Sequence, residues 1–249
     1  MNFLITGATS GLGYCIFKEL SKDSNNRIFI ISKNKEKLDK IKSENKNTNI
    51  YLLDLKDTEK TKEIADQVVI DSRNKIDVLI CNAGRGSFGS IDSIPLKDYV
   101  EDINVNFISH LILIKKIYPQ MRKDNFGHII NISSGTAIFG FENTSSYSVG
   151  KSSMQILIES IYMENLKNNI CSKNIFPGLF NSNFDKKNKF YGEVKGLPLI
   201  KKKSVDLIAK KVIKNLFSKK INIFCQPSPF IAFLIKIFPL IEKMRKFIF

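Results

Sequence analysis

Tyrosine and lysine side chains four residues apart are the first candidates for chemistry in this chain of 249 residues. Three pairs have this spacing: Tyr14 and Lys18, Tyr147 and Lys151, and Tyr191 and Lys195. On a helix such a pair shares one face, and an ammonium group beside a phenol favours the phenolate, which suits proton exchange at neutral pH. Because lysine is abundant in this chain, the spacing alone does not identify an active site.

Sequence context separates the three pairs. Tyr14 lies directly behind a glycine-rich turn, and Tyr191 lies in a polar segment without periodicity. Only Tyr147 follows a predicted strand that ends in two serines, with Ser134 thirteen residues before it. A hydroxyl at the carboxyl end of a strand can hydrogen-bond the same substrate oxygen as the phenol. We therefore predict that Ser134, Tyr147 and Lys151 act together; the alternative is a helix that merely exposes a Tyr and a Lys.

A glycine-rich turn follows the first predicted strand and opens a helix. Its candidate cofactor-binding residues are Thr6, Gly7, Ser10, Gly11, Leu12 and Gly13. Glycines at such a turn let the backbone approach a pyrophosphate, and the helix N-terminus supplies N–H groups and the positive end of the dipole. The alternative is that the glycines serve only the backbone geometry of the turn. The order of strand, turn and helix favours dinucleotide binding.

The end of the second predicted strand indicates which dinucleotide fits. NAD sites place an acidic side chain there to bind the ribose 2′-hydroxyl, whereas this strand ends in Ser32 and Lys33. Ser32 can donate a hydrogen bond to a 2′-phosphate, and Lys33 supplies a positive charge. These residues favour NADP(H); the alternative is that Lys33 is one solvated lysine among many.

The spacing of the glycine turn, T-G-x-x-x-G-x-G, resembles the coenzyme motif of the short-chain dehydrogenase/reductase family. The segment from Cys81 to Gly84 resembles the family's N-N-A-G segment, with Cys81 in place of the first Asn. The matching motifs run in the family's order from Thr6 to Ser182. The resemblance implies a Ser-Tyr-Lys-Asn active site and hydride transfer between NADP(H) and a carbonyl/secondary alcohol pair.

The resemblance also implies roles for further residues. Asn106 would complete the catalytic group through water and Lys151, with Asn104 as the competing residue. The residues expected to lie along the cofactor are Asp54, Asn82, Ala83, Gly84, Pro177, Gly178 and Ser182. Asp54 would contact the adenine ring, and Ser182 would bind the carboxamide. On the sequence alone, Asp54 could equally be a helix cap.

The elements that position these residues alternate along the chain. Short apolar segments predict buried parallel strands at residues 3–6, 28–32, 50–53, 78–81, 128–133, 170–176 and 221–225. Helical spacing lies between them at residues 12–22, 35–44, 58–74, 102–122, 147–167 and 205–217. This alternation predicts an α/β fold in one domain over residues 1–249: a Rossmann-type, doubly wound, seven-stranded parallel sheet with helices on both faces.

The net charge of +15 is concentrated near the end of the chain. Residues 1–185 hold 23 basic and 21 acidic side chains, and residues 186–249 hold 16 and 3. Residues 183–203 are polar and Lys-rich, which predicts a basic lid excursion beyond the strand ends. Residues 229–249 mix bulky apolar residues with Lys and Arg, as membrane-surface segments do; the alternatives are packing on the sheet or a partner subunit, or docking of an acidic carrier protein.

Composition restricts the remaining functions. Four Cys without metal-ligand spacing and only two His predict reduced thiols and no metal site. No base-reading element is visible, which argues against nucleic acid, and no signal peptide precedes the first strand, which favours the cytoplasm, with peripheral membrane contact possible. Apolar residues after Ser134, such as Phe139 and Phe141, favour an apolar or acyl-type substrate unless they are local core. We expect a reductase that forms a homo-oligomer; the alternative is a non-catalytic NADP(H)-binding regulatory or membrane-surface protein.

Overall fold

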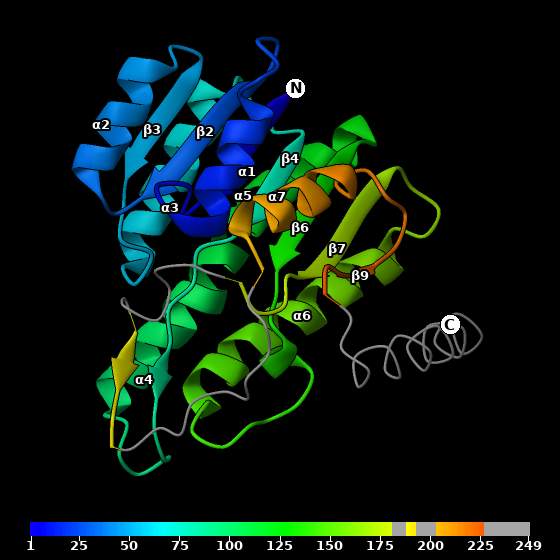
Figure 1. Cartoon of the computed structure of the whole chain (residues 1–249). Helices are drawn as coiled ribbons and strands as arrows, with labels where there is room; N and C mark the ends of the chain where they lie inside the picture. Colours follow the sequence, from blue (N-terminus) through cyan, green and yellow to red (C-terminus); the bar gives the residue numbers. More distant parts are fainter. Residues whose placement is uncertain (181–187, 193–202, 227–249) are drawn as a thin grey trace.

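A parallel seven-stranded sheet lies at the centre of the computed structural model, which describes residues 1–180, 188–192 and 203–226 (Figure 1). The strands are β1 (Asn2–Thr6), β2 (Arg27–Ser32), β3 (Thr48–Leu52), β4 (Val78–Cys81), β6 (Gly127–Ile132), β7 (Ile170–Phe176) and β9 (Asn222–Phe224). Their order is β3-β2-β1-β4-β6-β7-β9. The order reverses between β1 and β4, and ligands of open parallel sheets bind beyond the strand ends at such a point.

Helices cover both faces of this sheet and produce two apolar cores (Figure 1). One face carries α1 (Gly11–Leu20), α2 (Lys35–Glu44) and α7 (Val205–Lys214); the other carries α3 (Thr58–Asp71), α5 (Ser109–Asp124) and α6 (Ser145–Glu164). Successive strand residues alternate between the cores: Ile28 and Ile30 face the first, Phe29 and Ile31 the second. Both faces are buried, so the strands are continuous apolar runs in the sequence. The predicted Rossmann-type fold is confirmed.

The helix predicted over residues 102–122 is longer and is built from three elements. They are α4 (Leu96–Ile103), the π-helix η1 (Asn104–Ile108) and α5. The prediction missed the first turns of α4 because the residues this helix buries are acidic, Asp98 and Asp102. An apolar period therefore does not mark its inward face.

A second, two-stranded sheet was not predicted from the sequence. It pairs β5 (Ser87–Phe88) in parallel with β8 (Lys189–Phe190). Two-residue strands are too short for a period to be detected. β8 falls within the predicted lid excursion; most of that excursion, Ser182 and the tail at residues 229–249 lie outside the described residues. In the described ranges, no helix combines the length and apolar character needed to cross a membrane.

Candidate active site

The glycine turn after β1 has the backbone geometry that the sequence predicts. Gly7 and Gly11 have φ angles of +71° and +56°, which L side chains rarely adopt. A Cβ on Gly13 would lie 2.6 Å from the carbonyl oxygen of Gly7, so this helix position requires glycine. The Asn82 amide nitrogen donates to the Thr6 carbonyl oxygen at 3.0 Å and holds the β4 end against the turn.

The N-terminus of α1 has no side-chain cap hydrogen bond. Ser10 occupies the N-cap position, and its side chain does not cap the first-turn N–H groups. The first turn has no acidic residue, and Leu12 points into the core. First-turn N–H groups without a side-chain cap, behind a turn that only glycine can form, fit a pyrophosphate. The turn thus fits a dinucleotide.

The end of β2 carries a hydroxyl and a cation. The Ser32 hydroxyl hydrogen-bonds the Thr9 hydroxyl at 2.6 Å, which ties β2 to the glycine turn. The Lys33 ammonium lies 3.5 Å from the Asp54 carboxylate, and the two side chains are 68% and 32% exposed. Asp57, rather than Asp54, caps α3, so the helix-cap alternative for Asp54 is wrong. The Asp54 carboxylate follows β3, whereas β2 itself has no acidic residue. The end of β2 therefore lacks the carboxylate of NAD sites and suits a 2′-phosphate.

Ser134, Tyr147 and Lys151 come together at the carboxyl end of β6. Tyr147 is hydrogen-bonded to Ser134, and the Lys151 Nζ lies 5.9 Å from the centroid of the Tyr147 ring. Lys151 is buried, and its ammonium donates to the Ile132 carbonyl oxygen at 2.8 Å. Of the other two Tyr and Lys pairs, Tyr14 packs against the first core and Tyr191 hydrogen-bonds Asp98. Of the three pairs, Tyr147 and Lys151 are the pair whose phenol is hydrogen-bonded to a serine in the described residues, which leave out Lys195.

Thr136 sets the direction of the hydrogen bond between Ser134 and Tyr147. The Thr136 backbone N–H and hydroxyl both donate to the Ser134 hydroxyl oxygen, at 3.3 and 3.1 Å. A hydroxyl has two acceptor lone pairs and one proton, so Ser134 donates its own proton toward Tyr147. The sequence analysis missed Thr136, although its place two residues after Ser134 was a usable signal.

Burial dominates the proton affinities of the Tyr147 and Lys151 side chains. Burial raises the pKa of Tyr147 to about 12, partly offset by the hydrogen bond from Ser134. Burial lowers the pKa of Lys151 to about 8. The Tyr147 shift is opposite to the sequence expectation, because the ammonium donates to the Ile132 carbonyl and does not outweigh the loss of water around the phenol. The phenol therefore keeps its proton at neutral pH.

Asn106 lies beside this group, inside the π-helix η1. Its amide donates to the Arg85 carbonyl oxygen at 2.7 Å and accepts from the Arg85 N–H at 3.2 Å. A Cβ on Gly84 would lie 3.0 Å from the Asn106 Oδ1 and 3.4 Å from the Lys151 Nζ, so these three residues converge. Asn104 instead donates to the Lys56 carbonyl, away from the site. The structure therefore favours Asn106 over Asn104.

His110 is a buried polar residue that the sequence analysis missed. The Thr6 hydroxyl oxygen accepts N–H bonds from Asn82 and Ala83 at 3.0 Å each. Its proton has two acceptors within reach, the Nε2 of His110 at 2.9 Å and the Ile80 carbonyl at 3.5 Å, and the shorter distance favours His110. The Nδ1–H of the ring then faces the Asn106 carbonyl at 3.5 Å. Burial lowers the pKa of His110 to about 3, so the ring is neutral. A His four residues after Asn106, in a chain with two His, was the available signal.

The remaining predicted residues lie around the same strand ends. Gly178, which follows Pro177 after β7, has a φ of +75°, and a Cβ there would lie 2.8 Å from the Cβ of Gln226. In the segment after Ser134, Phe139 and Phe141 are 39% and 48% exposed, so they are not local core. Large apolar surface therefore lies on the chain that leads from Ser134 to Tyr147.

A sequence model of the family described as short chain dehydrogenase matches residues 2–190. The chain belongs to the short-chain dehydrogenase/reductase family. The glycine turn, the Cys81–Gly84 segment and the Ser-Tyr-Lys group are the motifs through which the sequence resembles that family, and the seven-stranded parallel sheet agrees with it. The four side chains of the expected Ser-Tyr-Lys-Asn group lie on β6, α6 and η1 and at their ends.

Two relatives of this short-chain dehydrogenase/reductase are reductases. A 3-oxoacyl-acyl-carrier-protein reductase of Rickettsia conorii is 30% identical over 200 residues, covering 79% of this chain and 80% of that protein. A 3-ketodihydrosphingosine reductase of Bacteroides thetaiotaomicron is 29% identical over 181 residues, covering 73% and 64%. The chain spans about half the length of the mycobacterial oxidoreductases that it matches, 51% for the protein of Mycobacterium bovis.

A solved structure has the same fold. The short-chain dehydrogenase of Sphingobium yanoikuyae in complex with NADPH superposes with a TM-score of 0.82 at 18% identity, covering 99% of this chain and 94% of that one. The oxidoreductase family and the Rossmann-type fold are thus established. The family and the fold do not identify the substrate, which has to be inferred from the side chains around the candidate active site.

Proposed function

We propose that this short-chain dehydrogenase/reductase is an NADP(H)-dependent reductase of carbonyl compounds that carry an apolar or acyl-type substituent. The observation that carries the proposal is the convergence of three side chains: the Tyr147 phenol is hydrogen-bonded to Ser134, and the Nζ of buried Lys151 lies 5.9 Å from its ring centroid. Reduction needs a group that gives a proton to the forming alkoxide. A phenol with a pKa of about 12 has that proton at neutral pH.

Each side chain has a defined part in the proposed reaction. NADPH, when bound to the glycine turn, supplies the hydride that reduces the carbonyl carbon. Ser134 and Tyr147 bind the carbonyl oxygen, and the Tyr147 Oη gives its proton to that oxygen as negative charge develops there. The Lys151 ammonium then stabilises the phenolate that remains. Asn106 holds the backbone of Arg85 and keeps Gly84 close to Lys151.

The cofactor preference follows from the end of β2. Lys33 is exposed and has no carboxylate on its own strand, which supports a 2′-phosphate and so NADP(H). The Sphingobium relative bound to NADPH is consistent with this preference. The exposed rings of Phe139 and Phe141 support an apolar substrate, as do the acyl and long-chain substrates in the names of the two reductases.

Substitution of Tyr147 by Phe tests the proposal. With a panel of ketones and acyl thioesters, followed by NADPH absorbance, we expect Tyr147→Phe to lower kcat by about a hundredfold or more, since a positioned proton donor contributes on that order. The matched control is Tyr14→Phe, which removes the phenol of a Tyr and Lys pair outside the site and should leave kcat unchanged. Equal activity of Tyr147→Phe and the wild type would refute the catalytic assignment.

The same panel discriminates the alternative of a non-catalytic NADP(H)-binding protein. A binding protein does not need a phenol and an ammonium at one strand end, and the convergence of Ser134, Tyr147 and Lys151 therefore favours an enzyme. NADPH binding without oxidation by any carbonyl of the panel would instead favour a regulatory or membrane-surface role.

A further inference from the structure

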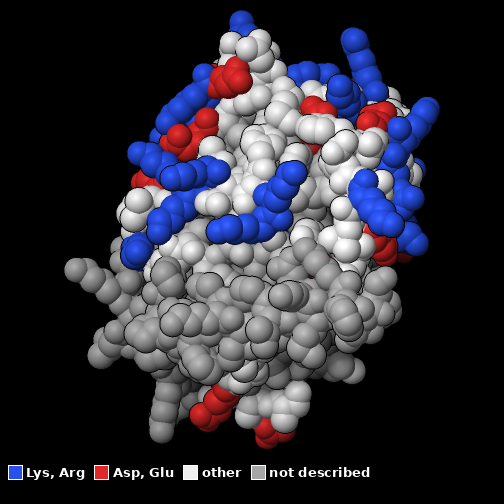
Figure 2. Space-filling model, turned by 90° about the vertical axis from the view of Figure 1, so that its right-hand side faces the viewer, with Lys and Arg blue, Asp and Glu red and all other residues white. Residues whose placement is uncertain are grey.

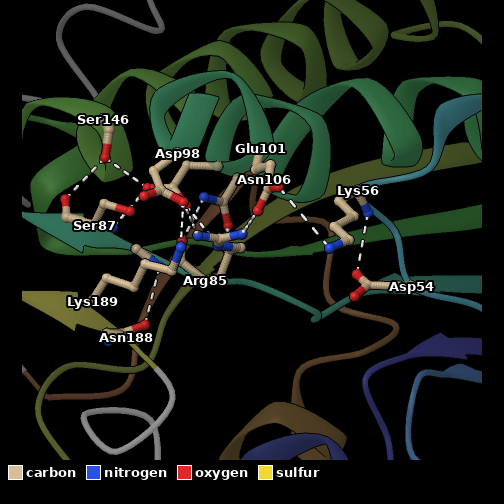
Figure 3. A network of polar contacts seen from close by, with 12 residues as sticks. Asp54, Lys56, Arg85, Ser87, Asp98, Glu101, Asn106, Ser146, Asn188 and Lys189 are labelled. Atoms are coloured by element: carbon tan, nitrogen blue, oxygen red, sulfur yellow. Dashed lines mark hydrogen bonds and ion pairs between the residues drawn. The ribbon is translucent and has the colours of Figure 1, made fainter. Parts of the chain in front are cut away.

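The loop after Gly84 is fastened to β8 by main-chain bonds. The N–H groups of Lys189 and Tyr191 donate to the carbonyl oxygens of Gly86 and Phe88, at 3.1 and 2.8 Å. The Gly86 N–H donates to the Asn188 side chain at 3.0 Å (Figure 3). A segment a hundred residues away in the chain therefore lies directly on the loop that leaves the cofactor region.

Three acidic side chains of α4 fix this arrangement by charge (Figure 3). Arg85 forms ion pairs with Asp98, Glu101 and Asp102, and its Nε lies 2.7 Å from the Asp102 carboxylate. The Asp98 carboxylate also binds the Lys189 ammonium at 2.5 Å and the Tyr191 hydroxyl. Asp98 is buried, whereas the Lys189 side chain is 52% exposed, so this ion pair is screened less than one between two exposed side chains.

The start of α6 is hydrogen-bonded to β5 and to α4. The buried Ser146 hydroxyl contacts the Ser87 carbonyl oxygen at 2.9 Å and the Asp102 carboxylate at 2.7 Å, and the Ser87 N–H donates to that carboxylate at 2.6 Å. Ser146 directly precedes Tyr147. The positions of β5, β8 and the proton donor are therefore fixed relative to one another.

Phe88, in β5, contacts two other aromatic rings, that of Phe190 in β8 and, at a tilt of 45°, that of Tyr147. Phe190 stacks on Phe88 with ring centroids 5.4 Å apart and an interplanar angle of 20°, and Phe88 lies 5.8 Å from the Tyr147 ring. A Cβ on Gly86 would lie 2.8 Å from the Phe88 ring and 3.2 Å from Tyr147, so glycine permits this approach. The outer ring, Phe190, is 53% exposed.

We propose that Phe88 and Phe190 determine substrate specificity by forming an apolar wall beside Tyr147, and that Asp98 is a positioning residue that holds this wall through β8. The proposal rests on the proposed carbonyl reduction and names the part of the chain that selects its substrate. Phe190, an exposed ring stacked on the ring that contacts Tyr147, gives apolar surface to a substituent on the reacting carbonyl. Burial of the substituent against it favours longer alkyl chains.

The experiment compares 2-octanone with 2-butanone in Phe190→Ala, with Phe217→Ala as the matched control. Phe217 has the same exposure, 53%, but packs on His128 at the other end of the sheet. We expect Phe190→Ala to raise the KM for 2-octanone about tenfold, while its kcat and both constants for 2-butanone change less than about twofold. Phe217→Ala should not change the ratio. Equal ratios in the two variants would overturn the proposal.

Asp98→Asn tests the positioning role. It should shift the chain-length preference in the same direction as Phe190→Ala, and it should add nothing in the Phe190→Ala background, because both act through one wall. Asp98→Glu, which keeps the charge, should restore part of the preference. An Asp98→Asn effect that simply adds to that of Phe190→Ala would show that Asp98 does not act through the wall.

A binding measurement separates this proposal from the proposed function. Octanamide and acetamide have a carbonyl that resists reduction, and calorimetry on the NADPH-loaded protein gives their affinities without turnover. The wall predicts that Phe190→Ala weakens octanamide, but not acetamide, by about tenfold. A wild type that reduces no ketone would refute the function alone, whereas unchanged octanamide affinity would refute the wall alone.

Discussion

At the scale of single residues, we propose that the charge at the end of β2 determines the choice between the two nicotinamide cofactors. Lys33 pairs with Asp54 at 3.5 Å, but both side chains reach solvent. Exposed pairs of this kind contribute about 0–1 kcal/mol, so exchanging Asp54 for a phosphate costs little. Ser32 is already bonded to Thr9, which leaves Lys33 as the main source of discrimination.

Reversal of this charge should reverse the preference. In Lys33→Glu we expect the KM for NADPH to rise about tenfold or more, because a carboxylate repels the 2′-phosphate, while the KM for NADH changes less than about threefold. Initial rates with either cofactor measure the effect. Lys35→Glu, at an exposed lysine that begins α2, is the control. Equal losses with both cofactors would contradict the role of Lys33.

At the scale of elements, His110 connects the glycine turn of β1 to the π-helix that carries Asn106. The ring accepts from Thr6 and faces the Asn106 carbonyl only while it is neutral. The pKa of His110 is lowered from 6.5 to about 3, first by burial and then by the Lys151 ammonium. Below pH 6.5, His110 therefore binds a proton in the unfolded chain but stays neutral in the folded chain. The free energy of unfolding falls as the pH drops toward 3.

His110→Gln removes this titration. Between pH 7 and 4.5 the wild type should lose about 2–3 kcal/mol of stability through this group, and the variant should lose that much less, although it is less stable at pH 7. Urea unfolding at both pH values measures the difference. His128→Gln, at the other buried histidine with a pKa of about 4, should retain the His110 component. An unchanged pH dependence in His110→Gln would show that the ring is not held neutral.

The sequence predicts the elements and side chains that belong to a regular pattern or motif. It does not predict the hydrogen bonds and ion pairs that form between segments distant in the chain. The strands of the large sheet and the group of Ser134, Tyr147 and Lys151 follow from apolar runs and motif order. The spacing of Thr136 from Ser134 and of His110 from Asn106 marks both as candidates. Only the fold shows that Thr136 donates to the Ser134 hydroxyl and that His110 lies against the Thr6 hydroxyl. The inward face of α4 is acidic because Arg85 lies opposite it, and only the fold brings the two together.

At the scale of the whole molecule, most of the net positive charge lies in a different part of the chain from the predicted catalytic residues. The catalytic body is nearly neutral, and the excess of 13 positive charges belongs to residues 186–249. In the described part of that region, α7 and the turn after it carry five lysines: Lys210, Lys211, Lys214, Lys219 and Lys220. Figure 2 shows Lys and Arg side chains spread across the middle of one face, with fewer acidic side chains between them. We propose that this basic region binds an anionic partner.

Removal of residues 229–249 tests whether that partner is a membrane. We expect the shortened chain to lose binding to vesicles with anionic lipid, because its bulky apolar and basic residues are removed together. NADPH binding should persist, since the glycine turn and Lys33 remain. Co-sedimentation with anionic and with zwitterionic vesicles, beside calorimetry with NADPH, measures both. If the full-length protein does not co-sediment with anionic vesicles, this result contradicts the membrane proposal and favours a protein partner.

The π-helix between α4 and α5 has a consequence for tolerated changes in chain length. The Ser109 N–H bonds the Asn104 carbonyl, five residues back, so this turn holds one residue more than an α-helix would. Deletion of a single residue there would convert it to α-helix and rotate α4 by about 100° relative to α5. Asp98 and Asp102 would then turn away from Arg85. Relatives with a one-residue gap in this stretch should therefore also lack the Arg85 partners on α4.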